Sequence, residues 1–202
     1  MPIARLTGQE RRAAIIDAAI NSFAQKGFSG VTTRELAHSA GVSEPVLYDH
    51  FPSKRDLYNA IIEKIAADSE GSFSDWPGNL PSGTDDREFF TALASAIIDW
   101  HERNPAYVRL LLFSALEGHE FGEIFFERHS VRFFNALAGH IRGRIEAGAL
   151  RPVDPMLATQ HFIGVVMHFG MHCSISRKGT QCAPRDAVVP TMVDIFLKGI
   201  EA

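Results

Sequence analysis

The sequence predicts an all-α protein in which an N-terminal three-helix helix-turn-helix domain is joined, through a fourth helix, to a larger helical domain. Three observations lead to this prediction. Helix-capping sequences recur along the 202-residue chain. The apolar residues that follow them repeat at spacings of three and four, as on one face of a helix. A Ser-, Gly-, Pro- and Asp-rich stretch interrupts this pattern over residues 69–86.

Four helices are predicted within residues 1–68, because each is preceded by a residue that can cap it. The capping residues are Thr7, Thr32, Ser43 and Ser53. The first helix covers residues 8–26, where Ile, Ala and Phe form an apolar stripe. Gly41 ends the second helix and tolerates the left-handed backbone of a turn, so the second and third helices form a helix-turn-helix.

Residues 69–86 are predicted to be a linker or loop, with one domain before them (1–68) and another after them (87–202). The second domain reads as helices throughout, with no strand-like alternation. Its predicted helices cover residues 86–103, 105–118, 120–147, 155–176 and 184–200.

Charge gives only a weak indication of partners. The net charge is −4, but residues 1–66 hold eight Lys and Arg against seven Asp and Glu, so the first third is the more basic part. No apolar run approaches the roughly 18 residues of a membrane span, and the polar N-terminus does not resemble a signal peptide. A cytoplasmic protein with no membrane attachment is expected.

The two cysteines predict no site of their own. Cys173 and Cys182 lie nine positions apart and form no CxxC motif. This spacing suits a reducing compartment and indicates neither a zinc site nor a disulfide framework, so a redox role is not expected.

The helix-turn-helix has the residue types that DNA binding requires. Its second helix would enter the major groove, and its first would cross the backbone. Thr32 and Thr33 stand at a helix start, where hydroxyl and N–H groups meet phosphate. Leu47 and Phe51 lie four residues apart and can face the core. The side chains left to reach DNA include Arg34, Tyr48, His50 and Lys54.

The stretch TTRELAHSAGVSEPVLYDHFPSKRDLY, residues 32–58, closely resembles the DNA-binding signature of TetR-type transcriptional repressors. The similarity runs from about Glu10 to Ile65, roughly a third of the chain. It implies a homodimer whose two N-terminal domains read a palindromic DNA operator. It also implies a C-terminal domain that dimerises and holds a small-molecule inducer.

The resemblance also assigns contacts by position. Phosphate contacts fall on Thr33, Tyr48, His50 and Lys54. Base-reading positions fall on Arg34, Ser43, Glu44, Pro45, Val46 and Asp49. Glu44 and Asp49 depart from the family pattern, which often has neutral or basic residues there. A carboxylate repels phosphate but can accept a hydrogen bond from cytosine.

The function expected from the sequence is that of a ligand-responsive DNA-binding regulator, most simply a repressor, with no cofactor. The expected effector is apolar or aromatic, and the candidate pocket residues are Trp100, His101, Arg109, Phe113, Phe125, His129, Phe133 and His168. The helices at 155–176 and 184–200 are expected to form the dimer interface, because the first is apolar on most of its faces.

Two alternative classes remain. His168 and His172 lie on one helical face, as in a metal site, and would make the protein a metal-sensing regulator. His161 lies one or two turns before them, at a spacing that a metal site could use. No carboxylate follows Asp154 in that helix, so a third protein ligand would have to come from elsewhere, and satisfied interface or pocket histidines are the preferred interpretation. An enzyme is the least favoured class, because the sequence lacks GxSxG, a P-loop, a strand-linked GxGxxG and HExxH.

Overall fold

The computed structural model describes residues 7–73, 85–117, 130–175 and 182–202. In these residues it is helical, and the only β contact recorded is an isolated bridge between Leu150 and Glu201. The all-α prediction is confirmed. The chain divides into two compact units, one of residues 1–68 and 106–125 and the other of residues 69–105 and 126–202. The chain therefore leaves the first unit after residue 68, returns to it for residues 106–125 and then enters the second unit again.

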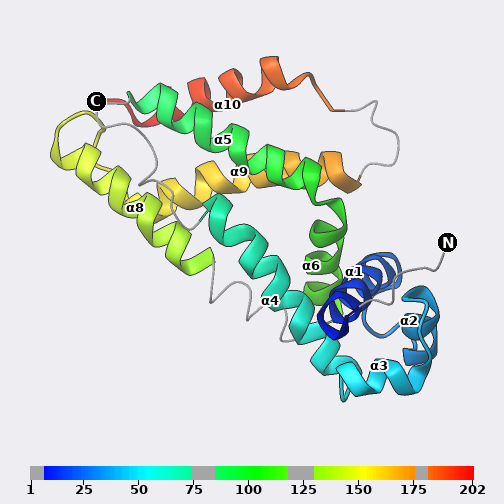
Figure 1. Ribbon diagram of the computed structural model, residues 1–202. Helices are drawn as coiled ribbons and strands as arrows, with labels where there is room; N and C mark the ends of the chain where they lie inside the picture. The colour runs from blue at the N-terminus through cyan, green and yellow to red at the C-terminus, as the bar shows by residue number, and fades with distance from the viewer. Residues whose placement is uncertain (1–6, 74–84, 118–129, 176–181) are drawn as a thin grey trace. The chain divides into compact units, whose positions relative to one another are not determined.

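The first unit begins with three helices that lie close to the positions predicted from the sequence. They are α1 (Gly8–Lys26), α2 (Thr33–Ser39) and α3 (Glu44–His50), drawn in Figure 1 in colours that run from dark blue to cyan. The predicted capping residues Thr7 and Thr32 each form a capping box, Thr7 with Glu10 and Thr32 with Glu35. Ser43 precedes α3 as predicted but makes no side-chain capping hydrogen bond.

Two more helices contribute to the first unit. The fourth helix, α4 (Lys54–Phe73), is longer than predicted and continues five residues into the stretch read as linker or loop. α6 (Pro105–Glu117) begins at the predicted proline. The interior of this unit is apolar, and its largest fully buried side chains include Phe23, Phe51, Leu36, Leu47 and Ile61. Phe23, Phe28 and Tyr58 form an aromatic cluster with ring centroids 4.9–5.7 Å apart.

The second unit contains α5 (Asp86–Arg103), α8 (Val131–Glu146), α9 (Pro155–Ile175) and α10 (Arg185–Ile200). α9 packs against both α5 and α8, and α10 packs against α5 (Figure 1). A single apolar cluster joins the four helices, and it includes Phe90, Ile97, Ile141, Phe162, Val166 and Leu197. The first part of the helix predicted at 120–147 lies outside the described residues.

Polar contacts fix the edges of the second unit. Arg144 donates two hydrogen bonds to Asp86, at 2.7 and 2.9 Å, which ties α8 to the start of α5. Arg185, the first residue of α10, pairs with Asp99 of α5. Among the described helices, none is long and apolar enough to cross a bilayer.

One expectation is wrong. Cys173, near the end of α9, and Cys182, three residues before α10, form a disulfide with their Cα atoms 5.9 Å apart. Spacing along the chain could not show this pairing, because it depends on the fold bringing Cys182 next to the end of α9.

Candidate nucleic-acid interface

The turn between α2 and α3 has the backbone of a helix-ending Schellman motif. Gly41 has a φ of 66°, a conformation that a residue with a side chain rarely adopts. The N–H of Gly41 donates to the His38 carbonyl, and that of Val42 donates to the Ala37 carbonyl, both at 3.0 Å. These bonds satisfy the last carbonyls of α2 and redirect the chain into α3. The predicted helix-turn-helix is present.

α3 separates its core face from its outward face. Leu47 and Phe51 are each only 2% exposed, as predicted from their spacing. Tyr48 is 45% exposed. The other outward positions vary, with Ser43, Pro45 and Asp49 exposed and Glu44, Val46 and His50 half-buried. On α2, Arg34 is exposed and Thr33 is half-buried. All of these candidate contact residues are therefore at least partly accessible at the surface.

A chain of hydrogen bonds connects the two helices on this surface. The Thr33 hydroxyl donates to Glu44 Oε1 at 3.0 Å, and the Tyr48 hydroxyl donates to Thr33 Oγ1 at 3.3 Å. Thr33 opens α2, whereas Glu44 and Tyr48 belong to α3. The chain holds the first turn of α3 against the start of α2. It also gives the Glu44 carboxylate a partner within the protein.

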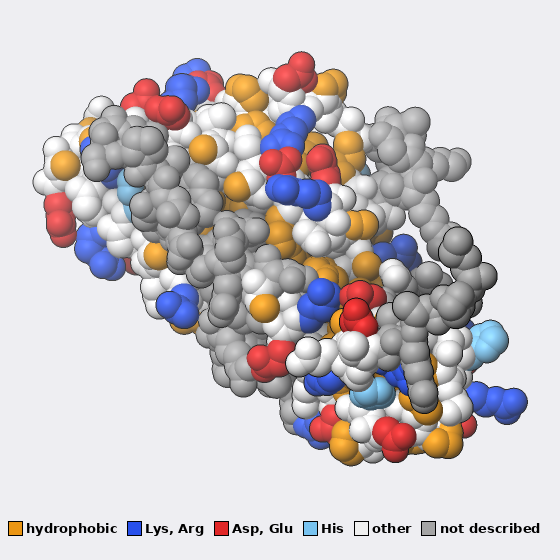
Figure 2. All heavy atoms as spheres, in the orientation of Figure 1, with side chains coloured by type: hydrophobic (Ala, Val, Ile, Leu, Met, Phe, Trp, Pro, Cys, Tyr) orange, Lys and Arg blue, Asp and Glu red, His pale blue; other side chains and the backbone are white. Residues whose placement is uncertain are grey.

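A second carboxylate on this unit is also occupied. Glu35 Oε1 accepts from Lys26 Nζ at 2.7 Å, and Glu35 Oε2 accepts from the backbone N–H of Thr32 at 2.8 Å. The bond from Lys26, followed by those from Thr32, lowers the pKa of Glu35 to about 2. Glu35 is thus ionised and committed to the start of α2. Figure 2 shows acidic, basic and hydrophobic side chains intermixed on the visible face.

Lys54, a predicted phosphate contact, has a structural role. Its ammonium donates to the carbonyl of Phe28 and lies 4.3 Å from the centre of the Phe28 ring. Burial lowers the pKa of Lys54 from its ordinary value. Lys54 therefore holds the turn between α1 and α2. Its contact with phosphate stays a prediction.

Sequence reasoning missed Glu117, which holds the same turn from α6. Its carboxylate accepts from the backbone N–H groups of Phe28 at 2.9 Å and Ser29 at 3.3 Å. Gly27 leaves room for it: a Cβ atom at Gly27 would lie 2.5 Å from Glu117 Oε1, and φ there is 73°. The Lys26-Gly27 ending of α1 was visible in the sequence, but no local pattern pointed to a partner about 90 residues away.

The predicted pocket residues fall in several places. Arg109 Nε donates to the carbonyl of Ala24 at 3.1 Å, near the end of α1, and Phe113 also lies close to Gly27. Trp100 is buried, and Phe133 packs against the core of the second unit. Phe125 and His129 lie outside the described residues. Membership of a common pocket stays a prediction for this set.

His101, another predicted pocket residue, is buried where α5 meets α9. Its Nδ1 lies 2.8 Å from the Ile97 carbonyl, and burial lowers the pKa of the imidazole. A Cβ at Gly170 would lie 2.8 Å from His101 Cγ, so this glycine allows the ring to approach α9. Within the residues that the structure describes, the role of His101 is packing and hydrogen bonding.

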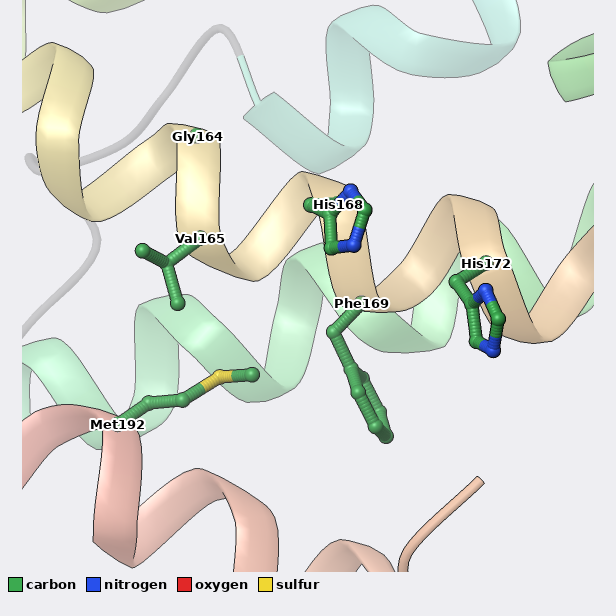
Figure 3. Close-up of a pocket in the computed structure, with 6 residues that line it drawn as sticks. All are labelled: Gly164, Val165, His168, Phe169, His172 and Met192. Atoms are coloured by element: carbon green, nitrogen blue, oxygen red, sulfur yellow. The ribbon is translucent and has the colours of Figure 1, made fainter. Parts of the chain in front are cut away.

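His168 lies in an open groove on α9 and α10, with a volume of about 410 Å³. The lining residues are Gly164, Val165, His168, Phe169, His172 and Met192 (Figure 3). Met192 extends from α10 toward α9. The rings of His168 and His172 lie nearly parallel, with centroids 6.3 Å apart. No three His, Cys, Asp or Glu residues of the described chain gather into a metal site.

Comparisons with known proteins match both parts of the chain. A family model described as bacterial regulatory proteins of the tetR family matches residues 15–61. A second, described as the C-terminal domain of AefR-like transcriptional repressors, matches residues 90–199, more than half of the chain. The nucleoid occlusion factor SlmA of Marinobacter nauticus is 31% identical over 141 residues, which are 70% of this chain and 69% of that protein.

Solved structures share the whole architecture. A TetR-like transcriptional regulator from a Rhodococcus species superposes with a TM-score of 0.75 at 19% identity, covering 96% of this chain and 98% of that one. AibR, solved with isovaleryl coenzyme A and operator DNA, superposes with a TM-score of 0.71 at 18% identity, covering 92% of this chain and 97% of that one. At these identities the likeness shows the fold.

Proposed function

Because the chain belongs to the TetR family of bacterial regulatory proteins, we propose that it is a homodimeric repressor that releases a palindromic operator when a small molecule binds its second unit. The geometry of α2 and α3 is the observation that carries this proposal. Leu47 of α3 and Phe51 just after it are buried, whereas Ser43, Pro45, Tyr48 and Asp49 are exposed on the side that could enter a major groove. The bonds from Thr33 to Glu44 and from Tyr48 to Thr33 fix α3 before DNA arrives.

The contacts proposed on DNA follow from this arrangement. Thr32, Thr33, Tyr48, His50 and Lys54 serve the phosphates, which position the protein without reading sequence. The base edges are left to Arg34, Ser43, Glu44, Pro45, Val46 and Asp49. A unit with an even mixture of charges gains little from long-range attraction. Two units bound at once compensate, because the second binds at a high effective concentration.

Dimerisation is proposed through α9 and α10. On α9, Leu157, Val165 and Met167 are 64%, 41% and 45% exposed, and on α10 Ile195 is 66% exposed. Exposed apolar side chains on these two helices support an interaction surface there. Gly164 has nothing within 4 Å of the place of a Cβ, so a partner helix can approach closely there. In an isologous dimer, the same surface of a second copy would cover these side chains, and each copy would bury the other's.

The effector is proposed to be apolar or aromatic. The aromatic core of the second unit, with Phe90, Phe162 and Phe196 at centroid distances of 4.8–4.9 Å, supports this class. AibR was solved with both an acyl thioester and operator DNA. The effector would act by linkage, lowering DNA affinity only by as much as it prefers the released state. A cytoplasmic location, where chromosomal DNA lies, is part of the proposal.

Selection of binding sites from a random duplex library with the purified protein tests the proposal. We expect an enriched palindrome whose half-site centres lie about one turn of B-DNA, 34–36 Å, apart. Acyl-coenzyme A thioesters and small aromatic acids are then titrated into the complex, with release followed by fluorescence anisotropy. A library that enriches no two-fold-symmetric site would overturn the proposed operator.

A further inference from the structure

The disulfide between Cys173 and Cys182 has no part in the function proposed above. These are the only two cysteines of the chain. Both residues are half-buried, so small reagents can reach the surface around them. In a protein that works beside chromosomal DNA, thiols are kept reduced, and disulfides that do form there are usually transient, catalytic or redox-sensing.

We propose that Cys173 and Cys182 are a reversible thiol–disulfide pair, oxidised by hydroperoxides, and that their redox state changes the affinity of the protein for its operator. The inference rests on the proposed function in two respects: the reducing compartment in which the protein works, and the operator binding that the redox state would change. The chemistry itself rests on the pairing of the two residues within one chain, which requires no second protein.

The oxidation balances with one hydroperoxide. The thiolate of one cysteine attacks the outer oxygen of the peroxide, the O–O bond breaks, and a sulfenic acid forms as the alkoxide or hydroxide takes up a proton. The second thiol attacks the sulfenic sulfur, forms the S–S bond and releases water. Two thiols and one peroxide thus give a disulfide, water and an alcohol, or a second water. A dithiol reverses the step by exchange and is itself oxidised.

The surroundings of the pair connect it to α5. Next to Cys173, the Ser174 hydroxyl lies 3.0 Å from the His101 carbonyl of α5 and 2.9 Å from that of Gly170. Three residues beyond Cys182, Arg185 donates to the Ser95 carbonyl at 2.9 Å and pairs with Asp99. The disulfide therefore joins two chain segments that are both hydrogen-bonded to the C-terminal half of α5.

The hydrogen bonds to α5 connect the cysteine pair, along the chain, to the unit that carries α2 and α3. α5 ends at Arg103, and Asn104 leads directly into α6, which belongs to the unit that carries α2 and α3. When the disulfide is reduced, the covalent cross-link between the end of α9 and the segment before α10 is lost, while the hydrogen bonds from Ser174 and Arg185 to α5 remain. We expect the oxidised and reduced forms to differ at least about fivefold in operator affinity, the lower end of ordinary coupling between sites.

Thiol counting on the full-length protein tests the chemistry without DNA. After dithiothreitol, alkylation with a polyethylene glycol maleimide should label two thiols. After hydrogen peroxide it should label none, and the intact mass should fall by two hydrogens. Cys173→Ser and Cys182→Ser should each fail to form the internal disulfide. Thiols that stay fully labelled after peroxide, or a disulfide that persists in glutathione buffers of cytosolic composition, would overturn the proposal.

Gel shifts on the selected operator test the regulatory part. Wild type should change its affinity between peroxide and dithiothreitol, whereas the double variant Cys173→Ser/Cys182→Ser should not respond. Its circular dichroism and thermal midpoint serve to confirm folding. Equal affinities of the two wild-type forms would overturn regulation by the pair. Failure to select an operator would instead count against the proposed function, since the thiol count is measured independently.

Discussion

Tyr48 is bonded within the protein and is also a proposed contact to DNA. Its hydroxyl donates to Thr33 at 3.3 Å, yet the side chain is 45% exposed. In Tyr48→Phe the ring remains and only the donor is lost. We expect affinity to fall about three- to tenfold, the value of one neutral hydrogen bond, on all duplexes alike, because phosphates carry no sequence information.

Fluorescence anisotropy on the selected operator and on a scrambled duplex measures this effect. Tyr107→Phe, on α6, is the matched control and should leave both affinities unchanged. A loss confined to the operator would mean that Tyr48 reads bases.

Asp49 differs from the other acids of this surface. Glu35 and Glu44 are hydrogen-bonded within the protein, whereas Asp49 is exposed at the outward side of α3. If it faces only phosphate, Asp49→Asn should raise affinity for every duplex by about threefold at low salt, and the gain should shrink as salt is added. Titrations at several salt concentrations, with Asp186→Asn on α10 as control, measure it. A loss restricted to sites with cytosine at one position would show that Asp49 reads that base.

At the scale of elements, local sequence signals predicted a helix correctly where residues at its own ends mark its start or stop. The capping residues Thr7 and Thr32 predicted the starts of α1 and α2, and the helices predicted at 86–103 and 105–118 agree with α5 and α6 to within one residue. The end of α4 was missed, because Ser and Gly in its last turns read as loop. The Glu117 contact and the disulfide could not be predicted, since each joins residues that only the folded chain brings together.

The start of α2 should be sensitive to acid. Glu35 has a pKa of about 2 in the folded protein, below its usual 4.5, because Lys26 and Thr32 bond its carboxylate. A lowered folded pKa adds stability that is complete above pH 4.5 and lost as pH falls toward 2. We therefore expect Glu35→Gln to lower the urea midpoint at pH 7 and to lower it much less near pH 2.5. Glu146→Gln, on α8, should show no such convergence.

The turn after α1 depends on a carboxylate from α6. Glu117→Ala leaves the N–H groups of Phe28 and Ser29 without this acceptor. We expect the free energy of unfolding to fall by about 1–3 kcal/mol, the cost of unsatisfied, partly buried donors. Glu117→Gln keeps one acceptor oxygen and should lose less. Urea denaturation measures both, with Leu116→Ala, an exposed neighbour, as the control. An unchanged midpoint for Glu117→Ala would show that water replaces the carboxylate without cost.

For the whole molecule, the path of the chain constrains how an effector can act. The chain leaves the first unit after residue 68, returns for residues 106–125 and then leaves again. α6 is bonded to the end of α1 by Arg109 and to the following turn by Glu117. The end of α5 is therefore joined, through Asn104, to a helix that belongs to the unit carrying α2 and α3.

The proposed dimer gives the last prediction. Val165 lies in the groove of α9 and α10 and is 41% exposed in the single chain. Val165→Glu would bury a charge in an interface whose neighbouring side chains include Phe169 and Met192, and the loss of hydration of that charge opposes association. We expect sedimentation equilibrium to show a monomer for this variant at concentrations where wild type is a dimer. Leu116→Glu, at a position 84% exposed on α6, is the matched control and should stay dimeric.

The effect on DNA follows from valency. A monomer engages one half-site, so the operator affinity of Val165→Glu should fall by about a hundredfold or more. Its affinity for a single half-site should match that of wild type, because α2 and α3 are unaltered. If Val165→Glu remained dimeric with full operator affinity, the two copies would meet through a surface other than this groove.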